Sequence, residues 1–414
     1  MSDQSARDIV TDDDIALAHD RIDDIVNRTP VDISTTFAEM SGATSVGLKL
    51  ENMQRTGSFK IRGAYNTMAQ LSDEVKERGV IASSAGNHAQ GVALAGDRLG
   101  IETTIVVPEV TPAAKIEATR GYGAEVIVEG EIYEDSYEYA LERADEDNLE
   151  FVHPFNDEGV IAGQGTIGRE LLEQYPDLDT VLVSIGGGGL ISGIATVLKH
   201  HDRSIRVIGV QPVGAYHAKP SLEHDEIREL SEIDTVAEGI ADTRLLEKTF
   251  AVIREYVDDV VSVSDLQMSV ALTLLAERAK TVVETAGAAP VAALLSDAVD
   301  VEGEHVAAIV SGGNVNLTEH SELTKTGLMQ LGRYAKVEIA VATWPTGVSA
   351  VTNVIESQGA ELDVLERTRR TAQDDPNRTP IRVGIEGSST EHLQSVIDAL
   401  DSLGQISVTS HTLN

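Results

Sequence analysis

The chain has 414 residues, which is enough for two or three domains with large hydrophobic cores. Its 68 acidic residues outnumber its 32 basic ones, and the formal net charge of −36 makes nucleic acid and anionic membrane surfaces unfavourable partners. The absence of cysteine from the sequence excludes disulfides, thiolate catalysis and cysteine-ligated zinc.

The N-terminal segment, MSDQSARDIVTDDD, is acidic, whereas a signal peptide begins with basic and then apolar residues. The rest of the sequence contains no run of 18 apolar residues that could span a membrane. We therefore expect a cytoplasmic protein that has no membrane partner.

Short apolar runs of strand length alternate with helical patterns along most of the chain. One such helix is expected over residues 88–100, where Val92, Ala95 and Leu99 share one face. Buried strands that alternate with helices predict an α/β fold whose parallel sheets are covered on both faces. The predicted strands lie within residues 79–87, 103–109, 124–130, 180–189, 205–212 and 305–314.

Polar and glycine-rich residues follow several of these predicted strands. They lie at residues 84–87, 186–189 and 311–314. Because ligands bind beyond the carboxyl ends of parallel strands, we expect the functional site there.

Lys60 stands between Phe59 and Ile61 in the segment RTGSFKIRGA (55–64), although the chain has only ten lysines. One interpretation is a surface lysine whose aliphatic stem covers apolar neighbours, which is the usual place of a lysine. The other interpretation is a desolvated amine with a chemical role. The other motifs favour the second interpretation.

The segment IGGGGLISG (185–193) follows a predicted strand and precedes a helical pattern. Consecutive glycines let the backbone approach an anion, and the helix N-terminus supplies free N–H groups, although a tight structural turn is the alternative reading. No Gly-Lys-Ser/Thr follows, and the strict G-x-G-x-x-G spacing fails, so a nucleotide motif is absent from the sequence. A phosphate site together with Lys60 favours pyridoxal phosphate, whose aldehyde reacts with a lysine amine.

Four motifs resemble those of the pyridoxal-phosphate lyases related to the tryptophan synthase β-subunit. They are SFKIRGA (58–64), SAGNHAQG (84–91), GGGGL (186–190) and SGGN (311–314). Within that group, residues 15–325 are most similar to the threonine ammonia-lyases, also called threonine dehydratases. The resemblance implies two parallel-sheet α/β domains, of which the large one comprises residues 1–47 and 152–331 and the small one residues 48–151.

The resemblance also implies a role for each motif. Lys60, positioned by Ser58 and Phe59, would form the Schiff base with pyridoxal phosphate and remove the substrate Cα proton. Asn87 would hydrogen-bond the ring hydroxyl of the cofactor, and Ser311 would face its ring nitrogen. The phosphate would bind to Gly186, Gly187, Gly188, Gly189 and Leu190. The substrate carboxylate would bind to the turn formed by Ser84, Ala85, Gly86, Asn87 and His88.

Two positions bear on the choice of reaction. A hydroxyl such as that of Ser311 does not keep the ring nitrogen protonated, which favours β-elimination over transamination; alternatively, Ser311 is only a turn residue at a strand end. Ile61-Arg62-Gly63-Ala64 has the form found in dehydratases and racemases. Similar serine racemases carry a serine at the position of Ala85, where it acts as an acid–base, so weak racemisation is expected here.

Relatives that bind a cation carry acidic side chains after the strand that matches residues 205–212. In this chain Gln211 and His217 occupy those positions and flank Ala215, whose carbonyl could still serve. We therefore assign no metal ligand.

Residues 332–414 have a separate pattern, which predicts the order βαββαβ. The expected strands are 335–343, 361–370, 379–387 and 406–412, with helices in 344–359 and 388–404 and a polar loop at 371–377. The second helix is expected to open on a capping box from Ser388 to Glu391. This order, with Pro345 and Gly347 after the first strand, resembles an ACT regulatory domain of the ferredoxin-like α+β type, and a purely dimerising module is the alternative.

The predicted function is pyridoxal-phosphate-dependent deamination of L-threonine to 2-oxobutanoate and ammonia, and of L-serine to pyruvate. The alternatives are a serine dehydratase or racemase, and a non-catalytic amino-acid-responsive binding protein on the same fold. We expect a homo-oligomer, either dimer or tetramer, with isoleucine or valine as effector. The acidic surface, the few lysines and the aromatic content of 4% indicate a halophilic source, because concentrated salt screens such charge.

Overall fold

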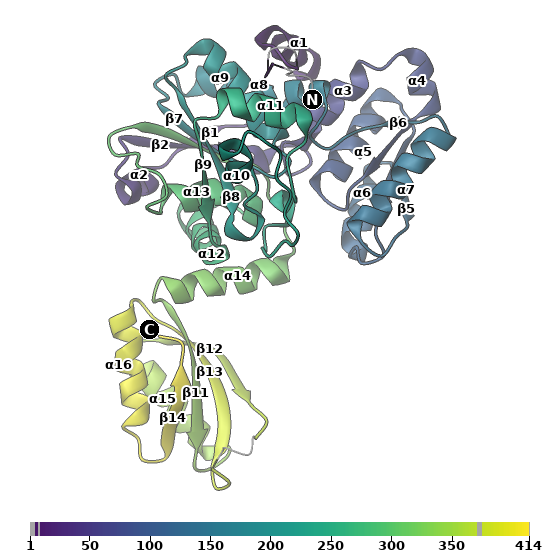
Figure 1. Cartoon of the computed structure of the whole chain (residues 1–414). Coiled ribbons are helices and arrows are strands. Elements are labelled where there is room, and N and C mark those ends of the chain that lie inside the picture. Colours follow the sequence, from purple (N-terminus) through teal and green to yellow (C-terminus); the bar gives the residue numbers. More distant parts are fainter. Residues whose placement is uncertain (1–4, 7–8, 371–374, 414) are drawn as a thin grey trace. The chain divides into compact units, whose positions relative to one another are not determined.

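The computed structural model describes residues 5, 6, 9–370 and 375–413. It divides into two compact units, Met1–Asn316 and Leu317–Asn414 (Figure 1). Within the described part of the chain, no helix is long and apolar enough to cross a membrane.

The first unit contains a six-stranded sheet with the strand order β1-β2-β10-β7-β8-β9. Neighbouring strands are parallel except for β1 and β2, which pair antiparallel. The strands are β1 (Val31–Ile33), β2 (Ser45–Leu50), β7 (Thr180–Ser184), β8 (Arg206–Pro212), β9 (Asp259–Val263) and β10 (His305–Val310). Residues 48–50, which the family resemblance assigns to the small domain, therefore lie in the larger sheet.

Helices accompany this sheet, and many of them pack on one another as well as on the strands. Helix α13 contacts four of the six strands, whereas α8 and α11 pack against α9. The helices are α1 (Asp12–Ile22), α2 (Thr35–Ser41), α8 (Glu158–Gln174), α9 (Gly189–His201), α10 (Ala218–Glu223), α11 (Glu247–Tyr256), α12 (Asp265–Leu274) and α13 (Thr285–Leu294).

A second sheet in the same unit has four strands, all parallel, in the order β5-β4-β3-β6. The strands are β3 (Val80–Ser83), β4 (Thr103–Val107), β5 (Glu125–Val128) and β6 (Glu150–Phe151). The helices are α3 (Lys60–Ala69), α4 (Asp73–Arg78), α5 (Asn87–Leu99), α6 (Ala113–Gly121) and α7 (Tyr133–Glu146). Val92 and Ala95 on α5 are buried and Leu99 packs beside them, so the predicted apolar face is confirmed.

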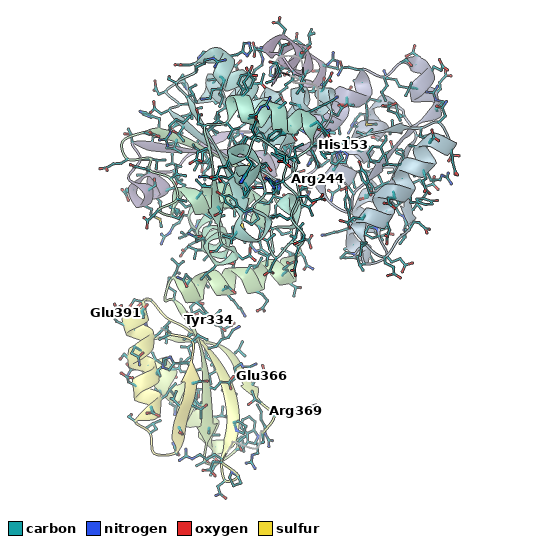
Figure 2. All side chains as sticks on the ribbon, viewed as in Figure 1. His153, Arg244, Tyr334, Glu366, Arg369 and Glu391 are labelled. Atoms are coloured by element: carbon teal, nitrogen blue, oxygen red, sulfur yellow. The ribbon has the colours of Figure 1, made fainter. Side chains whose placement is uncertain are left out.

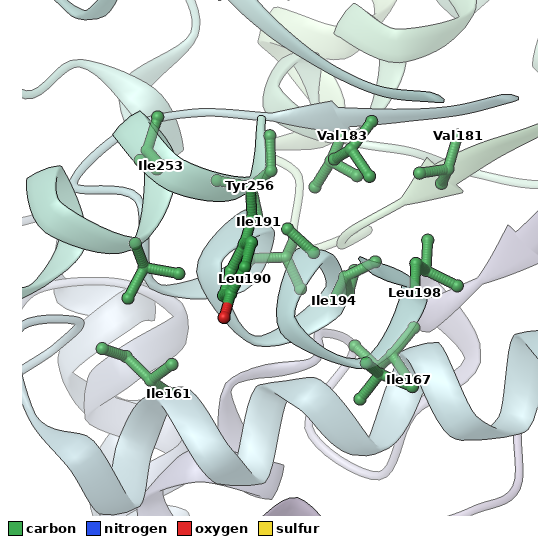
Figure 3. Packing of buried hydrophobic residues seen from close by; sticks show 14 of the residues in the cluster. Ile161, Ile167, Val181, Val183, Leu190, Ile191, Ile194, Leu198, Ile253 and Tyr256 are labelled. Atoms are coloured by element: carbon green, nitrogen blue, oxygen red, sulfur yellow. The ribbon is translucent and has the colours of Figure 1, made fainter. Parts of the chain in front are cut away.

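Helix α9 is fixed within the core of the larger domain. Figure 3 shows Leu190, Ile191, Ile194 and Leu198 of this helix among side chains from β7, α8 and α11. Each fully buried aliphatic side chain of this size stabilises the fold by about 2 kcal/mol. Packing of this kind holds the first turn of α9, and with it the glycine loop that precedes the helix.

The second unit is an α+β domain with a four-stranded antiparallel sheet in the order β12-β13-β11-β14. Two helices, α15 and α16, connect its strands in the predicted βαββαβ order. Its elements are α14 (Leu317–Gln330), β11 (Tyr334–Val341), α15 (Thr346–Ser357), β12 (Glu361–Arg367), β13 (Thr379–Glu386), α16 (Thr390–Asp401) and β14 (Ile406–His411). The predicted polar loop at 371–377 includes residues 371–374, which lie outside the described residues.

Helix α14 is grouped with the second unit, whereas the sequence pattern places the domain boundary after Leu331. Lys325 on this helix forms an ion pair of 2.9 Å with Asp363 on β12. The helix also packs against β11. These contacts explain why the compact unit begins at Leu317.

The predicted capping box at the start of α16 is wrong by one residue. Ser389, not Ser388, is the N-cap, and its side chain accepts a hydrogen bond from the His392 N–H at 3.2 Å. The His392 ring nitrogen Nδ1 in turn accepts from the Ser388 N–H at 3.1 Å. Because Ser389 has the extended backbone that an N-cap needs, the helix starts at Thr390 and Glu391 does not stand at the third position.

Candidate active site

Lys60 is the first residue of α3, and its amine lies in a confined environment. Its Nζ donates a hydrogen bond of 3.0 Å to the carbonyl oxygen of Pro154 and lies 5.2 Å from the centre of the Phe59 ring. Burial lowers the pKa of Lys60, although the negative charges of Asp242 and Glu284 oppose this shift. A lowered pKa increases the fraction of neutral amine, which is the form that attacks an aldehyde or removes a proton.

The segment that ends at Lys60 is hydrogen-bonded to the segment that follows β10. Ser58 and Gly312 form an antiparallel bridge, and the Phe59 N–H donates to the Ser311 carbonyl at 3.2 Å. Ser311 itself is buried. Two of the four sequence motifs, about 250 residues apart, thus meet directly in the fold.

Asn87, the first residue of α5, is held by two polar side chains. Its Nδ2 donates to Glu284 Oε1 at 2.7 Å, and its Oδ1 accepts from Asn314 Nδ2 at 2.7 Å. Burial raises the pKa of Glu284 to about 7, although hydrogen bonds from Asn87 and from the Asn314 backbone lower it. The orientation of the Asn87 amide is therefore fixed, as recognition of one ligand group requires.

The glycine loop between β7 and α9 has no room for side chains. A Cβ at Gly187 would lie 2.3 Å from the Phe155 ring, and one at Gly189 would lie 3.0 Å from the Phe155 Cα. Gly188 has φ of 92°, which is left-handed and favours glycine. The side chain of Leu190 is buried in the core, so only its backbone is available to a ligand.

The turn from Ser84 to His88 connects β3 to α5. The Gly86 N–H donates to Ser84 Oγ at 3.2 Å, and a Cβ at Gly86 would meet no atom within 4 Å. Nε2 of His88 donates to the Val152 carbonyl at 2.8 Å, and burial together with the charge of Lys60 lowers the pKa of His88 to about 3. His88 is therefore neutral near pH 7, and its neutral ring anchors the helix start, whereas open space lies beside Gly86.

The Gln211 and His217 side chains hydrogen-bond to each other. The ring nitrogen His217 Nε2 accepts from Gln211 Nε2 at 2.9 Å, and Gln211 Oε1 accepts from the Ala218 N–H at 2.8 Å. Burial lowers the pKa of His217 to about 4. In the part of the chain that the structure covers, no group of three His, Asp or Glu side chains is placed to bind a metal ion.

Three residues near Lys60 were not predicted from the sequence: Pro154, Asp242 and Glu284. Pro154 follows His153 (Figure 2), whose Nδ1 accepts from the N–H groups of Phe155 and Asn156 at 3.1 and 2.9 Å and so shapes this turn. The sequence pattern marks the position of Pro154 only weakly, because the preceding strand, β6, has only two residues. Glu284 could have been found from the sequence, because it is an acidic residue within the run VVETAGAAP, whose other residues are apolar or small.

The residues present fit pyridoxal phosphate. Lys60 offers a desolvated amine for the aldehyde, and the glycine loop offers a side-chain-free backbone at a helix N-terminus for the phosphate. Asn87 offers an oriented amide for the ring hydroxyl, and Ser311 lies beside Phe59 at the end of β10.

Comparison with known proteins gives one family match. Residues 22–312 match the model of the family described as pyridoxal-phosphate dependent enzyme. An L-threonine ammonia-lyase of Thermotoga maritima is 40% identical over 388 residues, which is 94% of this chain and 96% of that protein. The protein of Staphylococcus aureus called L-threonine dehydratase catabolic TdcB is 46% identical over 323 residues, which is 77% of this chain and 93% of that protein.

Two solved structures resemble this chain to a similar degree. Processed threonine deaminase isoform 2 of Solanum lycopersicum has a TM-score of 0.72 and 37% identity, covering 76% of this chain and 94% of that one. Maize serine racemase has a TM-score of 0.72 and 39% identity, covering 76% of this chain and 98% of that one. Overall similarity therefore does not separate deamination from racemisation, and individual residues have to decide between them.

Proposed function

The chain belongs to the family of pyridoxal-phosphate dependent enzymes, and we propose that it deaminates L-threonine to 2-oxobutanoate and ammonia. The observation that carries this proposal is the desolvated amine of Lys60, placed beside Phe59 and hydrogen-bonded to Pro154. The names of two relatives, L-threonine ammonia-lyase and L-threonine dehydratase, support the substrate. L-Serine would give pyruvate and ammonia by the same reaction.

Lys60 would have two roles. When bound, pyridoxal phosphate supplies a conjugated ring that accepts the negative charge developing at the substrate Cα. Lys60 would hold the aldehyde carbon of the cofactor at rest, and its free amine would take the Cα proton as a general base. Both roles need the neutral amine, which the lowered pKa of Lys60 favours, and the hydrogen bond to Pro154 orients that amine.

The remaining predicted residues would bind the cofactor and the substrate. Gly186 to Leu190 would hold the phosphate through backbone N–H groups, Asn87 would bind the ring hydroxyl, and Ser311 would face the ring nitrogen. The turn from Ser84 to His88 would bind the substrate carboxylate. The open space at Gly86 and the N-terminus of the 13-residue helix α5 support this assignment.

Serine racemisation is the second candidate function, because maize serine racemase is as similar in structure as the threonine deaminase. Ala85 argues against it. Alanine carries no proton donor, so the turn lacks a side chain at this position that could reprotonate Cα on the face opposite Lys60. A non-catalytic binding protein is less well supported, because it would need neither a desolvated lysine nor a glycine loop.

The decisive experiment measures products and the covalent cofactor together. The full chain, in molar salt, should convert threonine to 2-oxobutanoate, identified by chromatography, and borohydride reduction should fix pyridoxal phosphate on Lys60. Lys60→Ala should lose turnover by roughly 10³-fold and lose the fixed cofactor. Lys76→Ala, which removes a lysine from α4, is the control and should keep both. A wild-type protein that is colourless and still converts threonine to 2-oxobutanoate would contradict the proposal.

We also propose that the second unit, residues 317–414, is an ACT-like regulatory domain that binds isoleucine or valine and contributes to a homo-oligomer. Its βαββαβ order supports this assignment. The alignment with the Thermotoga maritima enzyme is long enough to extend well into this unit. A response to isoleucine would place the enzyme in isoleucine synthesis. The excess of acidic residues supports a cytoplasm of high salt concentration as its location.

A further inference from the structure

Asp242 lies against the glycine loop, on the side of Gly186 and Gly187. The Gly187 backbone N–H interacts with its carboxylate and lowers its pKa. A Cβ at Gly186 would lie 2.4 Å from Asp242 Oδ2 and 2.9 Å from the Cα of Ile240. A carboxyl group of the protein therefore lies against the loop that would bind the cofactor phosphate and occupies the surroundings of one of its N–H groups.

The surroundings of Asp242 only partly balance its charge. Burial raises the pKa of Asp242, whereas the charge of Lys60 and the Gly187 N–H favour its charged form. Among the described residues, no Lys or Arg forms an ion pair with its carboxylate. Tyr133, on the first turn of α7, is also close enough that the negative charge of Asp242, after burial, raises the pKa of its hydroxyl. The carboxylate thus has the Gly187 N–H as its backbone partner and no adjacent cation.

A carboxylate and a phosphate cannot both accept from the same N–H group, and their negative charges repel at short range. We propose that Asp242 is an internal competitor of the cofactor phosphate for Gly187 and thereby weakens and slows cofactor binding. Phosphate binding requires the Asp242 carboxylate to leave the Gly187 N–H. This inference rests on the proposed phosphate site at the glycine loop.

The competition must depend on the phosphate and not on the aldehyde or the ring. Pyridoxal, which lacks the phosphate, therefore separates the two contributions. Inorganic phosphate, which lacks the ring, tests the loop alone. Asp242→Asn keeps the size of the side chain and removes the charge, and Asp242→Ala removes the competing group altogether.

The experiment uses the full chain after hydroxylamine has removed any cofactor. Visible absorption measures the Kd and association rate of pyridoxal phosphate and of pyridoxal, and melting curves measure stabilisation by inorganic phosphate. Asp242→Asn and Asp242→Ala should bind pyridoxal phosphate at least about tenfold more tightly and faster than the wild type. Their affinity for pyridoxal should equal that of the wild type. Asp177→Asn, which removes an exposed carboxylate, is the charge-matched control and should change nothing.

Two results would overturn the inference. One is equal affinity of the wild type and both Asp242 variants for pyridoxal phosphate, and the other is weaker binding by the variants, which would make Asp242 a support of the loop. If either variant fails to fold, the affinities of the other variant for pyridoxal phosphate and for pyridoxal still test the inference. Failure of the proposed function has a different signature, because the wild type would then fix no cofactor on Lys60 even at saturating pyridoxal phosphate.

Discussion

Arg62 Nη1 lies 2.6 Å from Glu170 Oε1, and both side chains are buried. Arg62 also binds Glu51 Oε1 at 2.8 Å, and Glu170 binds Lys49 Nζ at 2.6 Å. These four charges connect the start of α3, two residues after Lys60, to the end of β2 and to α8. Lys60, the proposed catalytic residue, is thus placed on a helix whose first turn is held by a buried ion network.

Replacing Arg62 should therefore destabilise the protein strongly. Arg62→Met should lower the free energy of unfolding by about 3–5 kcal/mol, because Glu51 and Glu170 would remain buried without their partner. Denaturant unfolding monitored by circular dichroism measures the loss. Arg28→Met is the matched control, since Arg28 and Glu173 form an exposed pair of 2.6 Å whose loss should cost at most about 1 kcal/mol. Equal losses in the two variants would mean that the buried network has no special role.

Glu284 should give the stability of the cofactor-free chain a specific pH dependence. Its pKa is raised from 4.5 to about 7, so the folded protein binds this proton more tightly than the unfolded chain does. The stabilisation is complete below pH 4.5 and is lost as the pH rises through about 7, by up to about 3 kcal/mol.

The neutral variant Glu284→Gln should not show this loss. The unfolding free energy of the variant minus that of the wild type should therefore increase between pH 5 and pH 8, measured at constant molar salt. Glu247→Gln, at an exposed position on α11, should give a difference that is flat over the same range. If the difference for Glu284→Gln is also flat, the pKa of Glu284 is not raised in the folded protein, and this carboxyl is already ionised at pH 5.

Ala85 should determine the balance between deamination and racemisation. In the wild type, D-serine formed from L-serine should be minor beside pyruvate, because the turn carries no acid–base at this position. Ala85→Ser should raise the ratio of D-serine to pyruvate, measured by chiral chromatography of the same reaction. Ala85→Gly, which adds no hydroxyl, is the control. Comparable racemase and lyase rates in the wild type would contradict this assignment of Ala85.

The sequence predicted the strands of the first unit where apolar runs were long enough. The motifs at Ser84, Gly186 and Ser311 could be placed because β3, β7 and β10 are buried strands that end in polar or glycine-rich residues. By contrast, β6 has two residues, so the following turn at Pro154 had no pattern to mark it. Asp242 lies in a loop without periodicity, and its contact with Gly186 depends on tertiary packing between residues 56 positions apart.

The boundary of the proposed regulatory unit can be tested with two shortened chains. A chain that ends at Asn316 and one that ends at Leu331 should both deaminate threonine, and neither should respond to isoleucine or valine. The chain that ends at Leu331 should be the less soluble one, because α14 would lose its contacts with β11 and Asp363. Initial rates with and without effector, compared with the full chain, measure the response. A response that survives in the chain that ends at Asn316 would place the sensor in the first unit.

Salt dependence follows from the charge of the chain. With 68 acidic and 32 basic residues, repulsion within the folded state should be strong in dilute buffer, where the Debye length is about 30 Å at 0.01 M. At 1 M the Debye length is about 3 Å, so most surface repulsion is screened and the compact state gains stability. Melting temperature and activity should therefore both rise steeply between these limits, with KCl and NaCl acting alike.

The shape of the salt titration separates screening from a bound cation. Saturation at millimolar salt would indicate an ion at a specific site, for which the segment around Ala215 is the candidate, whereas a gradual rise into the molar range indicates screening. The Arg62–Glu170 pair should be insensitive to salt, because buried pairs are screened much less than exposed ones. The cost of Arg62→Met should therefore be similar at low and high salt, provided that both proteins fold. A melting temperature that stays constant from dilute buffer to molar KCl would refute the halophilic assignment and leave the enzymatic one intact.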